Sequence, residues 1–348
     1  MTKAAELAKM GEVLTNSQIG GRRNMIINGA MQVAQRGTSQ ASITSTGYYT
    51  LDRWQVVNTN GGTWTMSQDT DVPTGEGFAN SLKMDCTTAD TSLGASDHLY
   101  VRTKLEAQDC QNMKKGTSNA EKVTLRFWVK SSKTGTHIVE LLDNDNSRFV
   151  SLAYTISSAD TWENHTLTFP ADTTGAFADD NGVGLGIHWY MAAGSTYTSG
   201  TLGTTWNTTQ ANRAVGQVNV ADSTDNNWYL TGVQLEVGSQ ATPFEHRSFG
   251  EEKDLCYRYY EEGGFSMRAS GTVVRTGQSY TVTKRASATV EVFFDSSKAT
   301  AGTINVSNSN NSGWAEGGST NYWNMEKNTG SNGDGVDYNC HWTASAEL

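Results

Sequence analysis

The chain of 348 residues contains little proline, cysteine or charge: 3 Pro, 4 Cys and 18% charged residues. The cysteines stand at positions 86, 110, 256 and 340, and they form no CxxC pair. That spacing argues against zinc-ribbon and thioredoxin-type sites. Four cysteines in a chain of this length are also too few for a disulfide scaffold. We therefore expect buried free thiols.

Basic residues and long apolar runs are also scarce. Lys and Arg number 26 against 36 Asp and Glu, which gives a net charge of −10. Without a basic cluster, the chain is a poor partner for nucleic acid or for an anionic membrane surface. No apolar run approaches the roughly 20 residues of a membrane span, and the first residues lack the apolar core of a signal peptide. We expect no nucleic-acid partner, no membrane insertion, and synthesis and folding in a cytoplasm.

Recognisable catalytic motifs are absent. The sequence has no GxSxG elbow, Walker A motif, HExxH motif or kinase motif set, and its six histidines are isolated from one another. A Ser-His-Asp triad or a carboxylate pair for glycosidic cleavage needs no adjacency in sequence, so both stay open. The acidic pairs at 251–252 and 261–262 fit helix-terminal charge better than catalysis. The sequence predicts a protein that is not an enzyme, with a polysaccharide depolymerase as the alternative.

What the chain has in abundance is Ser, Thr, Asn, Gly and aromatic residues, which favour strands and turns. Short alternating segments recur, as in "KVTLRFWVKSS", where Val123, Leu125, Phe127 and Val129 point to one face. Many such strands, separated by turn residues, predict an all-β protein. We assign residues 24–247 to a jelly-roll β-sandwich and residues 265–348 to a smaller C-terminal β domain.

Two segments have helical patterns. In residues 1–23, three apolar residues recur at helical spacing and need a partner surface, in this chain, in sister subunits or in another protein. In residues 248–264, Ser248 and Glu251 form a capping-box pattern, which predicts a linking helix to about Glu262 that ends at Gly263 and Gly264. Residues predicted to lie at an oligomer interface are Leu7, Met10, Leu14, Leu255, Tyr259 and Tyr260.

Two kinds of binding site are considered. Sugars stack on flat aromatic faces, with amide and hydroxyl groups alongside. The candidates for glycan binding are Trp206, Trp314, Tyr322 and Trp323, with burial in a small core as the alternative. Asp143 and Asp145 in "DNDNS" offer alternating oxygen ligands of the kind calcium prefers, against a plain polar turn. No other cofactor is indicated.

Three segments carry a resemblance to a known family. "RRNMIINGAMQVAQRGTS" with "YTLDRWQ", and later "GVQLEVGSQATPFEHRSFGEEKDLCYRYYE", resemble the opening and the close of one sandwich in tail-fibre-like virion proteins of marine and other bacteriophages. These segments bracket residues 22–262. "KRASATVEVF" is similar to a strand motif in the distal domain of such proteins, although Ala288 stands where proline is usual.

The resemblance implies a virion component, built in the host bacterial cytoplasm, with a sandwich like those of carbohydrate-binding jelly rolls. It further implies a homotrimer that attaches to other virion proteins through its N-terminus and faces a host-surface polysaccharide with its C-terminal domain. The expected function is that of a tail fibre. The alternatives are a head decoration or other tail protein without receptor binding, and the depolymerase.

Overall fold

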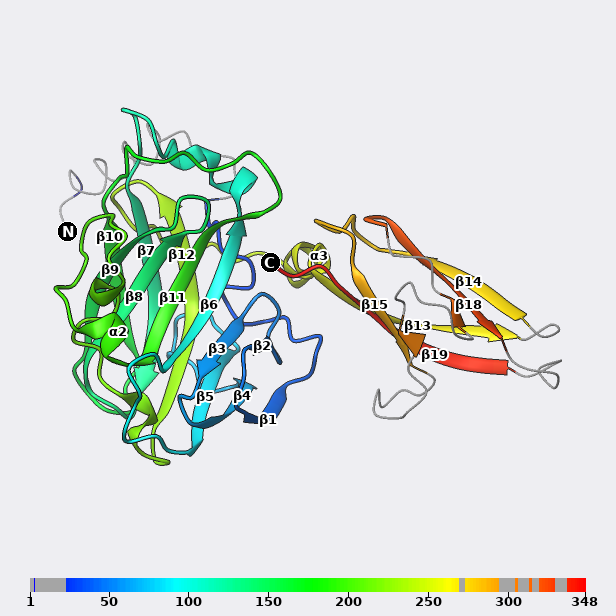
Figure 1. Ribbon diagram of the computed structural model, residues 1–348, viewed down its shortest axis with the longest axis horizontal. Helices are drawn as coiled ribbons and strands as arrows, with labels where there is room; N and C mark the ends of the chain where they lie inside the picture. The colour runs from blue at the N-terminus through cyan, green and yellow to red at the C-terminus, as the bar shows by residue number, and fades with distance from the viewer. Residues whose placement is uncertain are drawn as a thin grey trace. The chain divides into compact units, whose positions relative to one another are not determined.

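The computed structural model describes residue 3 and residues 23–268, 273–293, 304–305, 313–314, 319–328 and 337–348. The chain divides between Arg247 and Ser248 into two compact units. The N-terminal unit is a sandwich of two antiparallel sheets, and Figure 1 shows strands β6, β11 and β8 of one sheet lying across β7 and β12 of the other. The prediction of an all-β jelly-roll sandwich is confirmed.

In the described residues, each sheet of the sandwich has six strands. Sheet A has the spatial order β1 (Ser39–Ile43), β4 (Thr63–Asp69), β5 (Ser81–Thr88), β12 (Asn227–Val237), β7 (Val123–Ser131) and β10 (Glu163–Phe169). Sheet B has the order β2 (Gly47–Tyr48), β3 (Gln55–Thr59), β6 (His98–Glu106), β11 (Val183–Ala193), β8 (Gly135–Asp143) and β9 (Arg148–Ile156). The short helices in residues 23–247 of this unit are η1 (Ala107–Met113), α2 (Ser195–Thr198), η2 (Gln210–Asn212) and η3 (Val220–Asp222). Within the residues that the structure describes, no helix has the length and hydropathy needed to cross a bilayer.

The core of the sandwich lies between the two sheets, because alternate residues of each strand point inward. Trp54, Trp64, Trp189 and Trp228 are fully buried there. The rings of Trp54 and Trp189 lie 5.5 Å apart, centroid to centroid. Apolar side chains fill the inward positions, so a binding surface on either sheet would be formed by the outward-facing side chains.

The opening and closing segments of the sandwich lie side by side. Asn24 donates through its side chain to the carbonyl of Val233 at 3.1 Å, and its backbone N–H donates to the carboxylate of Glu245 at 2.8 Å. The guanidinium of Arg247 donates to the carbonyls of Asn24 and Ile26. The opening and closing segments that carry the family resemblance therefore serve to close the sandwich.

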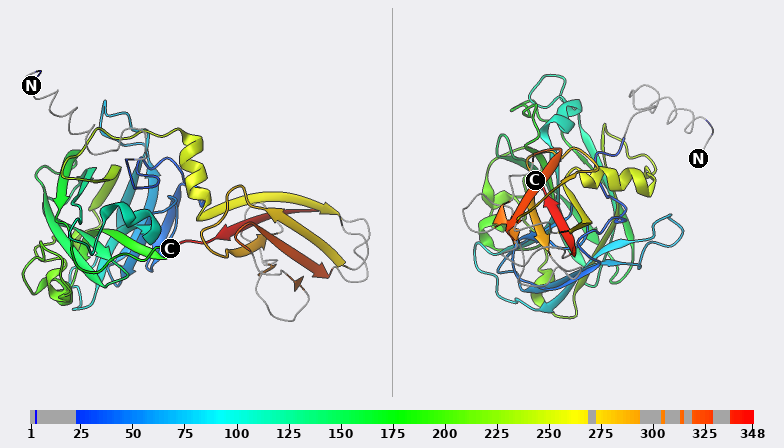
Figure 2. Two further views of the ribbon diagram at one scale, coloured as in Figure 1. Left: turned by 90° about the horizontal axis from the view of Figure 1, so that it is seen from above. Right: turned by 90° about the vertical axis from the view of Figure 1, so that its right-hand side faces the viewer.

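The C-terminal unit has a four-stranded and a three-stranded antiparallel sheet in its described residues. The first has the order β13 (Tyr260–Arg268), β19 (Asp337–Ser345), β15 (Thr289–Phe293) and β16 (Ile304–Asn305), and the second β14 (Val273–Ser279), β18 (Tyr322–Asn328) and β17 (Gly313–Trp314). Figure 2 shows β13 and β19 running together along this unit, with helix α3 (Phe249–Tyr257) at one end of it. Trp323, Trp342 and Tyr280 form its aromatic core.

The linking helix begins as predicted and ends earlier. Ser248 accepts the N–H of Glu251 through its hydroxyl, and the carboxylate of Glu251 accepts the N–H of Ser248, so the capping box is confirmed. However, α3 ends at Tyr257, and Gly263 and Gly264 lie inside strand β13. A Cβ at Gly263 would lie 2.8 Å from Nε1 of Trp342. Gly263 therefore makes room for the indole of Trp342 inside a strand, and it does not end a helix as the sequence predicted.

Two of the predicted interface residues, Tyr259 and Tyr260, follow the end of α3 and are buried within their own unit. Tyr259 is 1% exposed and Tyr260 is 7% exposed, and both pair with the end of the same chain around β19. Their expected role at a subunit interface is therefore corrected, because their own unit already covers them. Leu255 is half-buried. Leu7, Met10 and Leu14 lie outside the described residues.

Candidate functional site

One row of side chains crosses the whole outer face of sheet B. Residues directly opposite each other on neighbouring strands share a face of the sheet. The register pairs Tyr48 with Gln55, Gln55 with Arg102, Arg102 with His188, His188 with Glu140, and Glu140 with Ser151. We call these six residues the polar row. They come from six strands and from positions more than 100 residues apart in the sequence.

The centre of the polar row is a buried charge cluster. Glu140 is fully buried and accepts two hydrogen bonds from Arg213, at 2.7 and 2.6 Å, and one contact from Nδ1 of His188 at 3.0 Å. Burial alone would raise the pKa of Glu140, but the hydrogen bonds and charge of Arg213, aided by His188, hold that pKa below its ordinary value. Burial lowers the pKa of His188 to about 4 despite Glu140, with Arg102 and Arg213 adding to the effect. The cluster is therefore a carboxylate, a guanidinium and a neutral imidazole.

Arg213 belongs to residues 194–218, which we call the covering loop. This loop lies over the β11, β8 and β9 side of sheet B, where Figure 1 shows its helix α2 in front of the sheet. The apolar residues beneath it are Val57, Tyr100, Ile138 and Tyr190, which pack with Ala214 of the loop. Backbone bonds from Phe149 to Asn207 and from Ser151 to Gly203 fasten the loop along β9. The Glu140–Arg213 pair therefore joins the loop to the sheet.

Three flat rings stack along the boundary of the covered area. Tyr100 lies between His98 (centroids 5.5 Å apart, planes at 17°) and His188 (4.7 Å, 14°). Tyr197 of the covering loop meets the edge of His98 at 5.2 Å. A Cβ at Gly186 would lie 2.7 Å from Nε2 of His188, so the glycine makes room for the imidazole. The exposed end of the stack is His98 with Tyr197, since both are half-buried.

The covering loop leaves the β2, β3 and β6 side of the polar row open. Tyr48, Gln55 and Arg102 are half-buried. Nε of Arg102 donates to Oε1 of Gln55 at 2.7 Å, and the guanidinium carbon lies 5.9 Å from the centroid of Tyr100. This part, which we call the open half, presents a phenol, an amide and a guanidinium in one line. Such planar groups can bind a polar ligand that has several hydroxyl groups.

The cluster at Glu140 does not have the geometry of a hydrolase. The His188–Glu140 contact resembles the orienting half of a triad. Nε2 of His188 is buried, however, and it makes no hydrogen bond to a hydroxyl or thiol in the described part of the chain. Glu140 is already neutralised by Arg213. The arrangement is therefore suited to holding the covering loop against sheet B.

Two buried histidines make the unit sensitive to mild acid. Burial lowers the pKa of His137 to about 4, as it does that of His188. The unfolded chain binds protons on these rings below about pH 6.5, while the folded chain does not do so until about pH 4. We expect the free energy of unfolding to fall by about 2 kcal/mol per histidine between pH 7 and pH 5. Urea unfolding at both pH values measures this, and His137→Gln should remove its share; an unchanged pH dependence in that variant would contradict the assignment.

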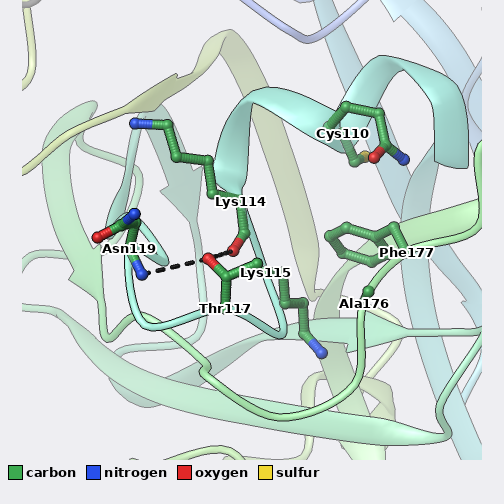
Figure 3. A pocket seen from close by; sticks show the side chains of 8 residues that line it. Cys110, Lys114, Lys115, Thr117, Asn119, Ala176 and Phe177 are labelled. Carbon is green, nitrogen blue, oxygen red and sulfur yellow. Dashed lines mark hydrogen bonds between the residues drawn. The ribbon is translucent and has the colours of Figure 1, made fainter.

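A second candidate is a pocket of about 420 Å³ beside η1. Figure 3 shows Lys114 and Lys115 pointing away from each other, with Phe177 on the far wall. Lys114 pairs with Glu121 at 2.8 Å, and Gln111 donates to the carbonyls of Ala107 and Ala178. The polar groups of this lining are therefore used within the protein, and the pocket makes a weaker site than the polar row.

Lys115, in the wall of this pocket, bears on the calcium prediction. Its ammonium binds the carboxylates of Asp143 and Asp172 and the carbonyls of Thr174 and Gly175. Asp145 accepts the N–H of Ala178 at 2.9 Å. Oδ2 of Asp143 thus already binds a cation of the chain itself, and its Oδ1 accepts the N–H of Asn146. Across the described residues, no three His, Cys, Asp or Glu side chains gather as metal ligands.

The aromatic residues predicted to bind glycans have different environments. Trp206 is half-buried, donates to the carbonyl of Pro170 at 2.8 Å, and lies over the Lys115 ammonium at 5.1 Å. Trp323 is fully buried in the core of the small unit. Its assignment to a glycan-binding surface is therefore corrected, because the small unit uses this indole to fill its core. Tyr322 is 49% exposed. The side chain of Trp314 lies outside the described residues.

Sequence reasoning missed the polar row. The alternation of "HLYVRTKLE" places Tyr100, Arg102 and Lys104 on one face of a strand. A lone arginine on the polar face of a strand is common, so this signal has no weight until the neighbouring strands are known. The cross-strand partners Gln55 and His188 could not be identified without the register.

No protein-family model matches the chain, and no curated protein matches it. Among solved structures, the enzymatically active domain of tailspike protein 4 from bacteriophage CBA120 is similar, with 13% identity and a TM-score of 0.33. That similarity covers 62% of this chain and 21% of the tailspike chain, so it spans about a fifth of that protein.

Two further similar structures are small domains. TmCBM61, solved in complex with β-1,4-galactotriose, is 10% identical, with a TM-score of 0.31, and the match covers 62% of this chain and 99% of that one. A putative sugar-binding protein from Bacteroides thetaiotaomicron VPI-5482 is 13% identical, with a TM-score of 0.32 and coverage of 62% and 100%. Likenesses of this size carry no functional assignment.

Proposed function

We propose that this protein binds carbohydrate through the open half of the polar row. The observation that carries the proposal is the line of Tyr48, Gln55 and Arg102 on the outer face of sheet B. A saccharide needs planar polar groups for its hydroxyls and a ring for its apolar face. The cluster at Glu140 and the covering loop hold one border of this line rigid, which limits the entropy lost on binding.

The proposal extends to the place of the protein in a particle. The opening and closing motifs of the sandwich resemble those of phage tail-fibre-like proteins, and this resemblance supports a virion component. We propose a homotrimeric tail fibre that attaches to other virion proteins through its N-terminus and binds a host-surface polysaccharide. The mass of the purified chain in solution tests the trimer: a monomer would favour a head decoration or another tail protein.

Binding should depend on the open half. We expect Gln55→Ala to weaken the binding of a responsive polysaccharide by about tenfold, because an amide that holds Arg102 and contacts sugar hydroxyls is lost. The measurement is a screen of immobilised bacterial polysaccharides followed by titration calorimetry. Asn164→Ala is the matched control, because Asn164 accepts a hydrogen bond from Nε of Arg126 on the opposite sheet at 3.1 Å. Equal losses in both variants would contradict a site on sheet B.

The same polysaccharides distinguish the enzyme alternative. Incubation with the protein should release no new reducing ends, because the buried histidine and carboxylate of the polar row are already paired. A rise in reducing ends that Glu140→Gln abolishes, in a variant that thermal melting shows to be folded, would replace the binding function with a depolymerase.

A further inference from the structure

An arginine without a carboxylate partner lies in the open half of the polar row. Four other arginines of the sandwich form ion pairs: Arg36 with Asp52, Arg148 with Asp172, Arg213 with Glu140, and Arg247 with Glu245. Arg102 contacts the amide oxygen of Gln55 and the ring of Tyr100, and no carboxylate in the described residues forms an ion pair with it. Its two terminal nitrogens are therefore available to an anion from outside the chain.

The surroundings of Arg102 keep its charge uncompensated. His188, next to it in the row, is neutral near pH 7 because burial holds its pKa low. Tyr100 is neutral as well, since burial raises the pKa of its phenol. These two neighbours of Arg102 therefore carry no negative charge that would offset its guanidinium.

The orientation of the guanidinium is fixed through Gln55. Because Nε donates to Oε1 of Gln55 at 2.7 Å, the plane of the guanidinium is set while its terminal nitrogens remain free. A planar guanidinium matches a planar carboxylate with two parallel hydrogen bonds. The amide of Gln55 and the phenol of Tyr48 continue along the row at the positions where sugar hydroxyls would follow.

We propose that the open half binds an acidic saccharide, a sugar of the uronic-acid kind, with its carboxylate on Arg102. This inference rests on the proposed function and narrows it to one class of glycan. The carboxylate replaces water on the guanidinium of Arg102, which no acidic group among the described residues neutralises, and the sugar ring lies along Gln55 and Tyr48.

The test compares polysaccharides that differ in the carboxylate alone. The full chain is titrated with polygalacturonate, alginate and hyaluronate, each beside its carboxyl-reduced counterpart, in which the acid has become an alcohol. We expect at least one acidic form to bind about tenfold or more tightly than its reduced form. Arg102→Gln should abolish that preference, and Arg102→Lys should keep only part of it, because a lysine lacks the two-pronged geometry.

Arg126→Gln is the matched control. Arg126 lies on the outer face of sheet A with Nε on an amide oxygen, as Arg102 does on sheet B, but it also donates to the carbonyl of Thr242. The preference for the acidic form should survive in this variant, and thermal melts should show that all three variants fold.

The outcomes separate the two proposals. Equal binding of acidic and reduced forms, or a preference that persists in Arg102→Gln, would overturn the acidic-saccharide inference and leave carbohydrate binding intact. Dextran sulfate is titrated beside them, and tighter binding of this sulfated glycan than of every carboxylated one would also overturn the inference. Failure of all glycans, neutral and acidic, would remove the proposed function itself.

Discussion

Replacing Glu140 by alanine is expected to lower the free energy of unfolding of the sandwich by about 3–5 kcal/mol, the typical effect of removing one partner from a buried ion pair. Glu140 is fully buried, and its loss removes the carboxylate that accepts from Arg213 and from Nδ1 of His188. Arg213 keeps its hydrogen bond to the amide oxygen of Gln210 at 3.1 Å, but no negative charge then offsets the desolvation of its guanidinium. Equilibrium denaturation of the full chain, followed through the tryptophans, measures the change.

Glu121→Ala is the matched control. Glu121 also forms an ion pair, with Lys114 at 2.8 Å, but both side chains are largely exposed, at 41% and 54%. Its replacement should change the stability by at most about 1 kcal/mol. Equal effects in the two variants would show that the Glu140 cluster is not buried as described.

The double replacement Glu140→Met with Arg213→Met separates charge from packing. A buried pair exchanged for apolar side chains of similar volume is often neutral in stability. We therefore expect the double variant to recover most of the loss seen in Glu140→Ala. If the stability of the double variant does not recover, the covering loop depends on the hydrogen bonds between Glu140 and Arg213 themselves. Displacement of the loop should then also weaken glycan binding at the open half.

The sequence was sufficient for the strands of the sandwich, because their alternation and turn residues are local signals. "KVTLRFWVKSS" became β7, with Val123, Leu125, Phe127 and Val129 in the core. The capping box at Ser248 was equally local. The end of that helix could not be predicted from local sequence. Gly263 lies in strand β13 because the indole of Trp342, 79 residues later in the chain, packs against it. A glycine pair looks the same in the sequence whether it ends a helix or makes room for a side chain in a strand.

The candidate site depends on contacts at long range. Strand order and register bring Gln55, Arg102 and His188 into one line, and a shift of one residue in any strand would turn its side chain into the core. The burial of Lys115 could not be predicted from the sequence either. In "MKKG" the two adjacent lysines have the same local sequence context, yet Lys114 is exposed and Lys115 is only 5% exposed. For Trp323 the sequence left both glycan binding and burial in a small core open, and the structure shows burial, because a small unit with few aliphatic residues needs the indole in its core.

Lys115→Ala is expected to have an effect as large as Glu140→Ala, about 3–5 kcal/mol of unfolding free energy. The ammonium lies between the carboxylates of Asp143 and Asp172 and beneath the rings of Phe177 and Trp206. Arg148 continues to neutralise Asp172, whereas Asp143, fully buried, loses its charge partner. Thermal and urea unfolding measure the loss, and Lys114→Ala, one residue earlier in the chain, should cost at most about 1 kcal/mol.

The same variant tests what the oxygen atoms around Lys115 can bind. Two carboxylates and two carbonyls are hard oxygen donors of the kind that hold calcium, and the alanine removes the ammonium that occupies their centre. We expect millimolar Ca²⁺ to stabilise Lys115→Ala by about 2–3 kcal/mol, as a ligand at about 100 times its Kd would, and to leave the unaltered chain unchanged. If calcium stabilises both proteins equally, the ion binds elsewhere. If it stabilises neither, the cradle is matched to a lysine ammonium in geometry as well as in charge.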